Sequence, residues 1–124
     1  MPDYILIVDD EQAMIDLLKV MLRMSNYPVE GATSGADAIA LAQVAPPRLV
    51  LLDLMMPDMS GFDVCQTLRT VPGLEAVPIA ILTAKHGPDV EEQAHRCGAN
   101  FLLIKPVTRG QLLELVEKAL NTVN

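Results

Sequence analysis

A chain of 124 residues fits one domain of ordinary size, and it is too short for a catalytic domain together with a regulatory one. Hydrophobic residues make up 51% of the chain but aromatic residues only 3%, which favours a core of aliphatic side chains. The formal net charge of -7 argues against direct contact with the phosphates of nucleic acid or with an anionic membrane surface.

The first predicted unit is a buried strand followed by an amphipathic helix. Tyr4 to Val8 form a continuous apolar run, typical of a strand buried on both faces of a parallel sheet, and the run stops at Asp9 and Asp10. Apolar residues then recur at helical spacing until residues 26–28 break the pattern. This stripe consists of Met14, Leu17, Leu18, Met21 and Leu22.

The second unit begins with a short predicted strand over residues 29–32. Ser34, with Asp37 three residues later, is a capping pattern that opens an alanine-rich helix, and a proline pair closes this helix. A third strand over residues 49–52 is apolar throughout and runs directly into Asp53. The first and third strands therefore both end in carboxylates.

The third unit follows a Ser-Gly turn. Apolar residues at three-residue spacing predict a helix over residues 62–68, and the next apolar run, residues 77–82, predicts a strand that ends at Thr83. A fourth helix comes next, with Asp89 and Glu92 as its expected capping pair.

The last unit is a strand over residues 101–104, which ends at Lys105 and Pro106, and a helix capped by Thr108 and Gln111. Strict alternation of strand and helix predicts an α/β fold with a parallel sheet. We expect a flavodoxin-like doubly wound (βα)5 three-layer sandwich with strand order 2-1-3-4-5.

The cysteines and histidines show no metal-binding pattern. Cys65 and Cys97 are isolated residues in predicted helices, without C-x-x-C spacing, so buried thiols are favoured over a disulfide. His86 and His95 lack partners at ligand spacing, which favours surface or loop positions.

Polar side chains end four of the five predicted strands, namely Asp9 with Asp10, Asp53, Thr83 and Lys105. Because right-handed crossovers bring the carboxyl ends of parallel strands to one edge, where ligands bind, we expect these side chains to line one cleft. The first and third strands are neighbours in this order, so Asp10 and Asp53 should lie about 5 Å apart. Three crowded carboxylates need a cation, and an all-oxygen site suits Mg2+.

These residue types suit phosphoryl transfer. The Asp53 carboxylate can attack phosphorus, while a cation and Lys105 neutralise charge on the phosphoryl oxygens and Thr83 supplies a hydroxyl donor. Taken singly, Asp and Thr residues at strand ends are ordinary turn formers or caps, and Lys105 is an ordinary surface lysine. Their joint occurrence is what favours a site.

Four segments, ILIVDDE, LVLLDLMMPDMSGFDV, AILTAK and GANFLLIKP, closely resemble the receiver domain of two-component response regulators. The resemblance covers almost the whole chain. It implies a phosphorelay signalling switch that accepts a phosphoryl group from a sensor histidine kinase or a histidine phosphotransfer protein. The switch would then change conformation on the face formed by the fourth helix, fifth strand and fifth helix, to regulate a protein partner or an output domain.

The resemblance also implies roles for single residues around a bound Mg2+. Asp53 would be the phosphoacceptor, Asp10 would bind Mg2+ directly, Asp9 would support the ion largely through water, and Met55 would contribute its backbone carbonyl. The only chemistry implied is phosphorylation and dephosphorylation of the domain's own Asp53, so we expect no enzyme activity on a separate substrate.

The residues of the last two strand ends resemble the switch elements of the family. Thr83 resembles the switch hydroxyl, the small Ala84 leaves access for phosphate, and Lys105 resembles the lysine that bonds the phosphoryl group. The peptide bond between Lys105 and Pro106 is expected to be cis.

One position departs from the family pattern. Family members often carry Tyr or Phe three residues before the lysine, whereas this chain has Leu102 there, with Phe101 beside it. Because side chains alternate along a strand, Phe101 should point to the opposite face and cannot substitute for that ring. Aromatic gating of the output face is therefore in question.

Two other classes of function stay open. A phosphatase of the haloacid dehalogenase type also uses a strand-end Asp, Mg2+, Thr and Lys, but it needs a second Asp where this chain has Met55, and usually a cap domain. A scaffold that kept the fold and works without phosphorylation is the other class, although every residue of the predicted pocket is present.

The chain carries no recognisable export or anchoring signal. Residues 1–4 lack the basic start of a signal peptide, and Asp53 interrupts the longest apolar stretch. We expect a cytoplasmic receiver domain over residues 1–124, with no output domain in this chain, no membrane contact and no direct binding of nucleic acid. Dimerisation through the face of the fourth and fifth helices is left open.

Overall fold

Strands and helices alternate strictly along the chain in the computed structural model, which describes residues 4–23 and 27–121. Within these residues the strands form one parallel sheet in the order β2-β1-β3-β4-β5, which confirms the predicted flavodoxin-like doubly wound fold. The elements are β1 (Ile5–Val8), α1 (Gln12–Met21), β2 (Val29–Ala32), α2 (Gly35–Val44), β3 (Leu49–Asp53), α3 (Gly61–Arg69), β4 (Ile79–Thr83), α4 (Pro88–Cys97), β5 (Phe101–Ile104) and α5 (Arg109–Asn121).

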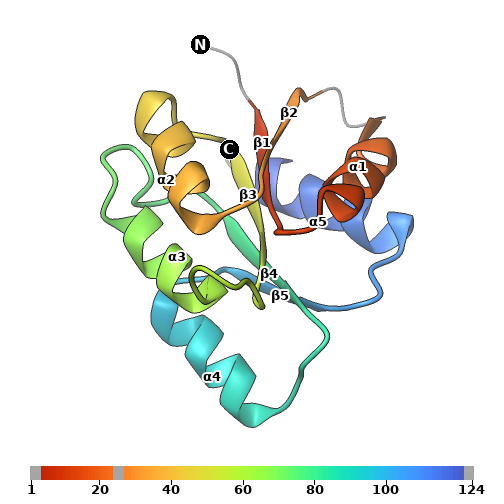
Figure 1. Cartoon of the computed structure of the whole chain (residues 1–124). Helices are drawn as coiled ribbons and strands as arrows, with labels where there is room; N and C mark the ends of the chain where they lie inside the picture. Colours follow the sequence, from red (N-terminus) through yellow and green to blue (C-terminus); the bar gives the residue numbers. More distant parts are fainter. Residues whose placement is uncertain (1–3, 24–26, 122–124) are drawn as a thin grey trace.

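Helices cover both faces of the sheet (Figure 1). α1 and α5 pack on the face that carries Ile7 and Leu51, while α2, α3 and α4 cover the face that carries Leu6 and Leu52. Every residue of β1 and β3 is buried, which explains why these strands are continuous apolar runs up to Asp53, the last residue of β3. Each fully buried Leu or Ile side chain contributes about 1.5–3 kcal/mol, so the central strands hold the sheet edge firmly in place.

Two of the predicted helix caps are present. The Ser34 hydroxyl accepts a hydrogen bond from the Asp37 backbone N–H at 3.1 Å and caps α2. The Thr108 hydroxyl accepts from the Gln111 N–H at 3.1 Å, and the Gln111 side-chain oxygen accepts from the Thr108 N–H at 2.9 Å. This reciprocal pair satisfies two donors that the first turn of a helix otherwise leaves unpaired.

The predicted cap of the fourth helix is wrong. α4 begins at Pro88, with Gly87 as its N-cap, so Asp89 lies inside the first turn. Proline has no N–H to satisfy and its backbone angle suits the first helical position, and Gly87 adopts a φ of 135° that favours glycine. The fourth strand also differs in its bounds, because β4 begins at Ile79 and includes Thr83.

The expectations for the cysteines and histidines agree with the structure. Cys65 and Cys97 are buried free thiols, and His86 and His95 are exposed. In the part of the chain that the structure describes, every helix is too short or too polar to cross a bilayer.

Arg69, the last residue of α3, joins the end of this helix to two later turns of the chain. Its guanidinium group donates to the carbonyls of Leu74 and Val77 at 2.9 and 2.6 Å, and to the Gly98 carbonyl at 3.1 and 2.6 Å. It also donates to the Asn100 side-chain oxygen at 2.8 Å. The turn before β4 and the turn before β5 are thereby held to the end of α3.

We expect Arg69→Met to lower the free energy of unfolding by about 2–4 kcal/mol, because several part-buried acceptors lose a charged donor at once. Urea unfolding followed by circular dichroism measures this. Arg96→Met is the control, since its ion pair with Glu92 is an exposed i,i+4 pair worth about 0.3–0.5 kcal/mol. Equal effects of the two substitutions would contradict the central role of Arg69.

Candidate functional site

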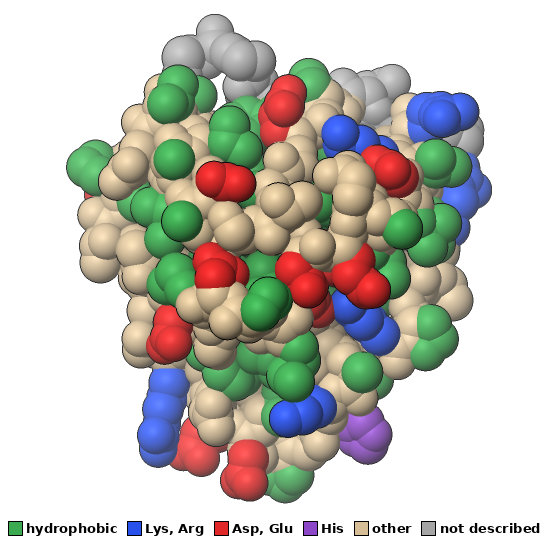
Figure 2. Space-filling model, viewed as in Figure 1, with side chains coloured by type: hydrophobic (Ala, Val, Ile, Leu, Met, Phe, Trp, Pro, Cys, Tyr) green, Lys and Arg blue, Asp and Glu red, His purple; other side chains and the backbone are tan. Residues whose placement is uncertain are grey.

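The carboxyl ends of β1 and β3 bring three aspartates together. Val8 pairs with Leu52, so Asp9 and Asp10 follow β1 beside Asp53, the last residue of β3. One carboxylate oxygen from each of the three residues lies within 4.8 Å of the other two. Asp9 and Asp53 are buried and Asp10 is exposed, so the cluster opens to solvent on one side. In Figure 2 acidic side chains gather across the middle of the face, with hydrophobic side chains below them.

Lys105 is the cation of this cluster. Its Nζ donates to Asp53 Oδ1 at 2.7 Å and lies 3.6 Å from Asp9 Oδ2. Burial alone would lower the pKa of Lys105, but the hydrogen bond and charge of Asp53 offset this, so the pKa is raised. The Lys105 backbone N–H also donates to the Thr83 carbonyl at 2.8 Å, which fixes the end of β5 against β4.

Asp53 is held in a site that opposes its ionisation. Burial raises its pKa, the hydrogen bond and charge of Lys105 lower it, and the charges of Asp9 and Asp10 raise it further, with a net upward shift. Asp9 is oriented by the Glu11 backbone N–H, which donates to its Oδ1 at 2.9 Å. The cluster thus has three acidic groups against one ammonium group.

The acidic cluster fits a hard divalent cation. Mg2+ binds oxygen at about 2.0–2.1 Å, so ligands on opposite sides of the ion lie about 4 Å apart. Oxygens that already lie within 4.8 Å of one another can surround one such ion with little movement. A cation there would also relieve the repulsion among the three carboxylates.

Thr83 is fully buried and does not hydrogen-bond to the aspartates. Its hydroxyl oxygen instead accepts from the Lys85 backbone N–H at 2.9 Å, in the loop between β4 and α4. Ala84, between these two residues, is exposed. A hydroxyl at the strand end is therefore coupled directly to the segment that leads into α4.

The remaining predicted residues lie in the loops after β3 and β5 and in β5 itself. Met55 lies in the loop after β3 and its side chain is 54% exposed. The Lys105–Pro106 peptide bond is cis, as the resemblance implied. Leu102 packs with the core on the side of α3 and α4, whereas Phe101 packs with the core on the side of α1 and α5, so the two face opposite ways as predicted.

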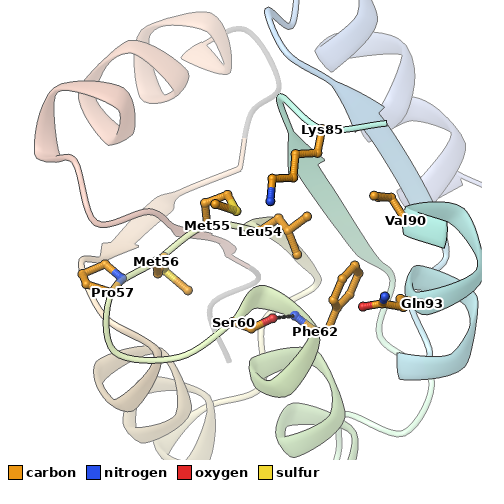
Figure 3. A pocket seen from close by; sticks show the side chains of 9 residues that line it. All are labelled: Leu54, Met55, Met56, Pro57, Ser60, Phe62, Lys85, Val90 and Gln93. Carbon is orange, nitrogen blue, oxygen red and sulfur yellow. Dashed lines mark hydrogen bonds between the residues drawn. The ribbon is translucent and has the colours of Figure 1, made fainter. Parts of the chain in front are cut away.

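A pocket of about 620 Å3 lies beside the loop after β3 (Figure 3). It is open to solvent, and its walls come from that loop, α3, the loop after β4 and α4. Met55, Phe62 and Val90 give it an apolar lining, and the Lys85 side chain reaches over it. The sequence gives no sign of this pocket, since its lining comes from four separate segments.

Two residues that support the site were not predicted. Gly61, the first residue of α3, packs so closely that a Cβ there would lie 2.6 Å from the Asp53 carbonyl oxygen and 2.8 Å from Leu54 Cα. Asp58 accepts from the Gly35 backbone N–H at 2.9 Å and ties the loop after β3 to the start of α2. The Ser60-Gly61 pair is visible in the sequence as a turn, but the close approach is not.

Gly61→Ala should lower the free energy of unfolding by about 1–3 kcal/mol, because the added methyl group meets backbone atoms that cannot move aside. The matched control is Gly110→Ala in α5, where the added Cβ would lie 4.0 Å from the Thr108 hydroxyl oxygen, an ordinary van der Waals distance. That substitution should raise stability by about 0.4–1 kcal/mol. Urea unfolding of both variants checks the opposite signs, and a destabilised Gly110→Ala or a neutral Gly61→Ala would disprove the packing argument.

The fold and this site define a flavodoxin-like α/β domain with an acidic cleft at the switch point of its sheet. The family model of the response regulator receiver domain matches residues 5–117, and the chain belongs to this family. Receiver domains are signalling switches rather than classical enzymes, and they bind Mg2+ in their active site. The haloacid dehalogenase alternative is therefore not supported.

Curated relatives agree with this family. The chain is 38% identical over 94% of its length to the DNA-binding dual master transcriptional regulator RpaA of Synechocystis, and spans 48% of that protein. It is 39% identical over 83% of its length to the response regulator PleD of Caulobacter vibrioides, and spans 23% of that protein. The chain thus spans half or less of the length of these relatives.

Solved structures agree as well. Chemotaxis protein CheY4 of Vibrio cholerae superposes with a TM-score of 0.91 at 29% identity, over 97% of this chain and 100% of that one. The receiver domain of sensor histidine kinase PA1611 from Pseudomonas aeruginosa has a TM-score of 0.88 at 25% identity, over 98% of this chain and 100% of that one. That structure has a magnesium ion coordinated in its active-site cleft.

Proposed function

We propose that this receiver domain is a phosphorylation-dependent switch in which Asp53 accepts a phosphoryl group in a Mg2+-dependent reaction. One observation carries the proposal, namely that Asp53 is buried at the centre of an acidic cluster with the Lys105 ammonium 2.7 Å from its Oδ1. A carboxylate held by a lysine beside two further carboxylates suits attack on a charged phosphoryl group once a cation is present. The assigned Mg2+ ligands are Asp9, Asp10, Asp53 and the Met55 carbonyl.

The transfer that we propose is a single displacement at phosphorus. Lys105 donates to Oδ1, so we assign the attack to Asp53 Oδ2. The bond from this oxygen to phosphorus forms as the bond from phosphorus to the donor breaks, and the donor keeps the electron pair. Bound Mg2+ would neutralise negative charge on the phosphoryl oxygens. Lys105 would then donate to a phosphoryl oxygen.

Thr83 is the proposed switch. Its hydroxyl oxygen accepts a hydrogen bond from Lys85, and its hydroxyl hydrogen can be donated to a phosphoryl oxygen. A turn of this side chain toward the phosphoryl group would alter the contact with the loop before α4. The exposed Ala84 leaves space for the phosphoryl group. Leu102 has no aromatic ring, so it would transmit the conformational change to the face of α4, β5 and α5 through its packing contacts.

The proposed partners follow from this chemistry. The donor would be a sensor histidine kinase or a histidine phosphotransfer protein, and the recipient of the signal a downstream protein or an output domain. We propose residues 1–124 as one receiver domain in the cytoplasm, without direct contacts to nucleic acid or membrane. The formal net charge of -7 supports the proposed absence of nucleic-acid contacts.

The test is phosphate uptake with and without metal. Incubation with acetyl phosphate and Mg2+ should add the mass of one phosphoryl group, measured by intact-mass spectrometry. A chelator should slow the uptake by about 100-fold or more, since charge on the transferring group is then not neutralised. Binding of Mg2+ without uptake from acetyl phosphate or from any kinase would instead favour the scaffold that works without phosphorylation.

A further inference from the structure

The two cysteines of the chain meet between α3 and α4. Cys65 lies in the middle of α3 and is 0% exposed, and Cys97 is the last residue of α4 and is 4% exposed. The Cys65 Sγ donates to the Cys97 carbonyl oxygen at 3.2 Å, and the Cys97 Sγ donates to the Ala94 carbonyl oxygen at 3.2 Å. Both thiols are free.

We propose that Cys65 and Cys97 are a redox-active thiol pair that closes into a reversible disulfide when a peroxide reaches it. The crosslink would join the middle of α3 to the C-terminal end of α4. The Cys65 sulfur already lies 3.2 Å from the Cys97 carbonyl oxygen across the helix interface, so rotation of the two side chains is the movement that would bring the sulfurs within bonding distance.

The surroundings favour a thiolate at Cys97. The Arg69 guanidinium donates to the carbonyl of Gly98, the next residue, at 3.1 and 2.6 Å, so a permanent positive charge lies beside Cys97. The contact with the Cys65 side chain lowers the pKa of Cys97, and the charge of Arg69 contributes to the lowering. The contact with Cys97, together with burial, raises the pKa of Cys65. Cys97 is therefore the attacking thiol and Cys65 the resolving one.

The reaction balances with hydrogen peroxide as the oxidant. The Cys97 sulfur attacks one peroxide oxygen, an S–O bond forms, the O–O bond breaks, and the leaving hydroxide takes a proton to become water. The Cys65 sulfur then attacks the sulfenic sulfur of Cys97, the S–S bond forms, the S–O bond breaks, and the proton of Cys65 leaves with the second water. The thiols lose two electrons, and the peroxide gains them.

Access is the step that limits the reaction. Cys97 lies in the final turn of α4, before Gly98 with its left-handed φ of 92°, and the ends of helices open more readily than their middles. A small oxidant can therefore reach Cys97 from the helix end, whereas Cys65 stays covered until it resolves the sulfenic acid.

Intact-mass spectrometry of the wild-type chain tests the proposal. After treatment of the folded protein with hydrogen peroxide, then alkylation in urea, we expect a species about 2 Da lighter than the reduced chain that takes up no alkyl group. Dithiothreitol should restore two alkylatable thiols. In the folded chain the crosslink should form within one molecule, because the fold holds the two cysteines next to each other.

Two variants assign the roles. In Cys65→Ala, Cys97 should form a sulfenic acid that dimedone traps, and in Cys97→Ala the covered Cys65 should stay reduced. The proposal is overturned if the folded wild type keeps both thiols, if the thiols oxidise to sulfinic acids without a crosslink, or if the crosslink forms only between molecules. The measurement on the wild-type chain tests whether the disulfide forms even if a variant folds poorly.

The consequence for signalling rests on the proposed function, since α4 belongs to the proposed output face. The crosslink would restrain α4 and reduce its response to phosphorylation. Hydrogen exchange of α4 in the reduced and oxidised chains, each with and without acetyl phosphate, measures this response. Formation of the disulfide is read out by mass alone, so failed phosphate uptake at Asp53 and failed oxidation of the thiols are separate results.

Discussion

Asp53→Ala is expected to abolish phosphate uptake from acetyl phosphate in the presence of Mg2+. Asp53 is a buried carboxylate of the cluster, and its Oδ1 accepts the hydrogen bond from Lys105 at 2.7 Å. Removing this carboxylate removes the nucleophile, and Asp9 or Asp10 would have to reach the same phosphorus from a different position. Intact mass before and after incubation measures the loss.

The matched control is Asp63→Ala. Asp63 is exposed in the first turn of α3, outside the cluster, so its loss should leave phosphate uptake unchanged. Asp53→Ala should remain folded, because the variant removes a buried acid whose pKa burial has raised, and Lys105 keeps Asp9 at 3.6 Å. Equal uptake by wild type and Asp53→Ala would reject the assignment of Asp53.

Lys105→Met should separate metal binding from phosphoryl transfer. The variant removes the only cation described in contact with Asp53 and Asp9, so the cluster becomes more negative. Mg2+ should then bind as tightly as in the wild type or more tightly, because an ammonium group no longer competes for Asp53. Phosphate uptake should fall by about 100-fold, because a preorganised donor to the phosphoryl oxygens is lost.

Isothermal titration with Mg2+ and the initial rate of phosphate uptake measure the two effects. Lys85→Met is the control, since Lys85 is exposed and lines the neighbouring pocket. Its removal should change the uptake rate by less than the removal of Lys105. Weakened Mg2+ binding in Lys105→Met, or unchanged transfer, would show that the lysine acts in another way than proposed.

The secondary structure could largely be predicted because burial imposes a period on the residues of each element. β1 and the first four residues of β3 are apolar throughout since both of their faces are covered, and this pattern needs no knowledge of which helix covers them. The error at α4 came from a capping rule applied two residues too late in the chain, since the N-cap is Gly87 and not Asp89. Asp89 and Glu92 have the spacing of a capping pair, but Pro88 and Gly87 decide where the helix begins.

Strand ends could be predicted to converge, because parallel strands with right-handed crossovers leave few arrangements. That topology accounts for Asp9, Asp10 and Asp53 meeting beside Lys105. It does not account for the partner of Thr83, since its contact with the Lys85 N–H depends on the path of one loop.

The sequence by itself determined the order of strands and helices, the family, and the polar residues that end the strands. Only the tertiary structure decided that Gly61 lies against the Asp53 backbone, that Arg69 joins the turns before β4 and β5, and that Cys65 meets Cys97. The physical reason is the range of the interactions. Periodicity and capping act within a few residues, whereas these contacts depend on how two helices and a sheet pack, which no local pattern encodes.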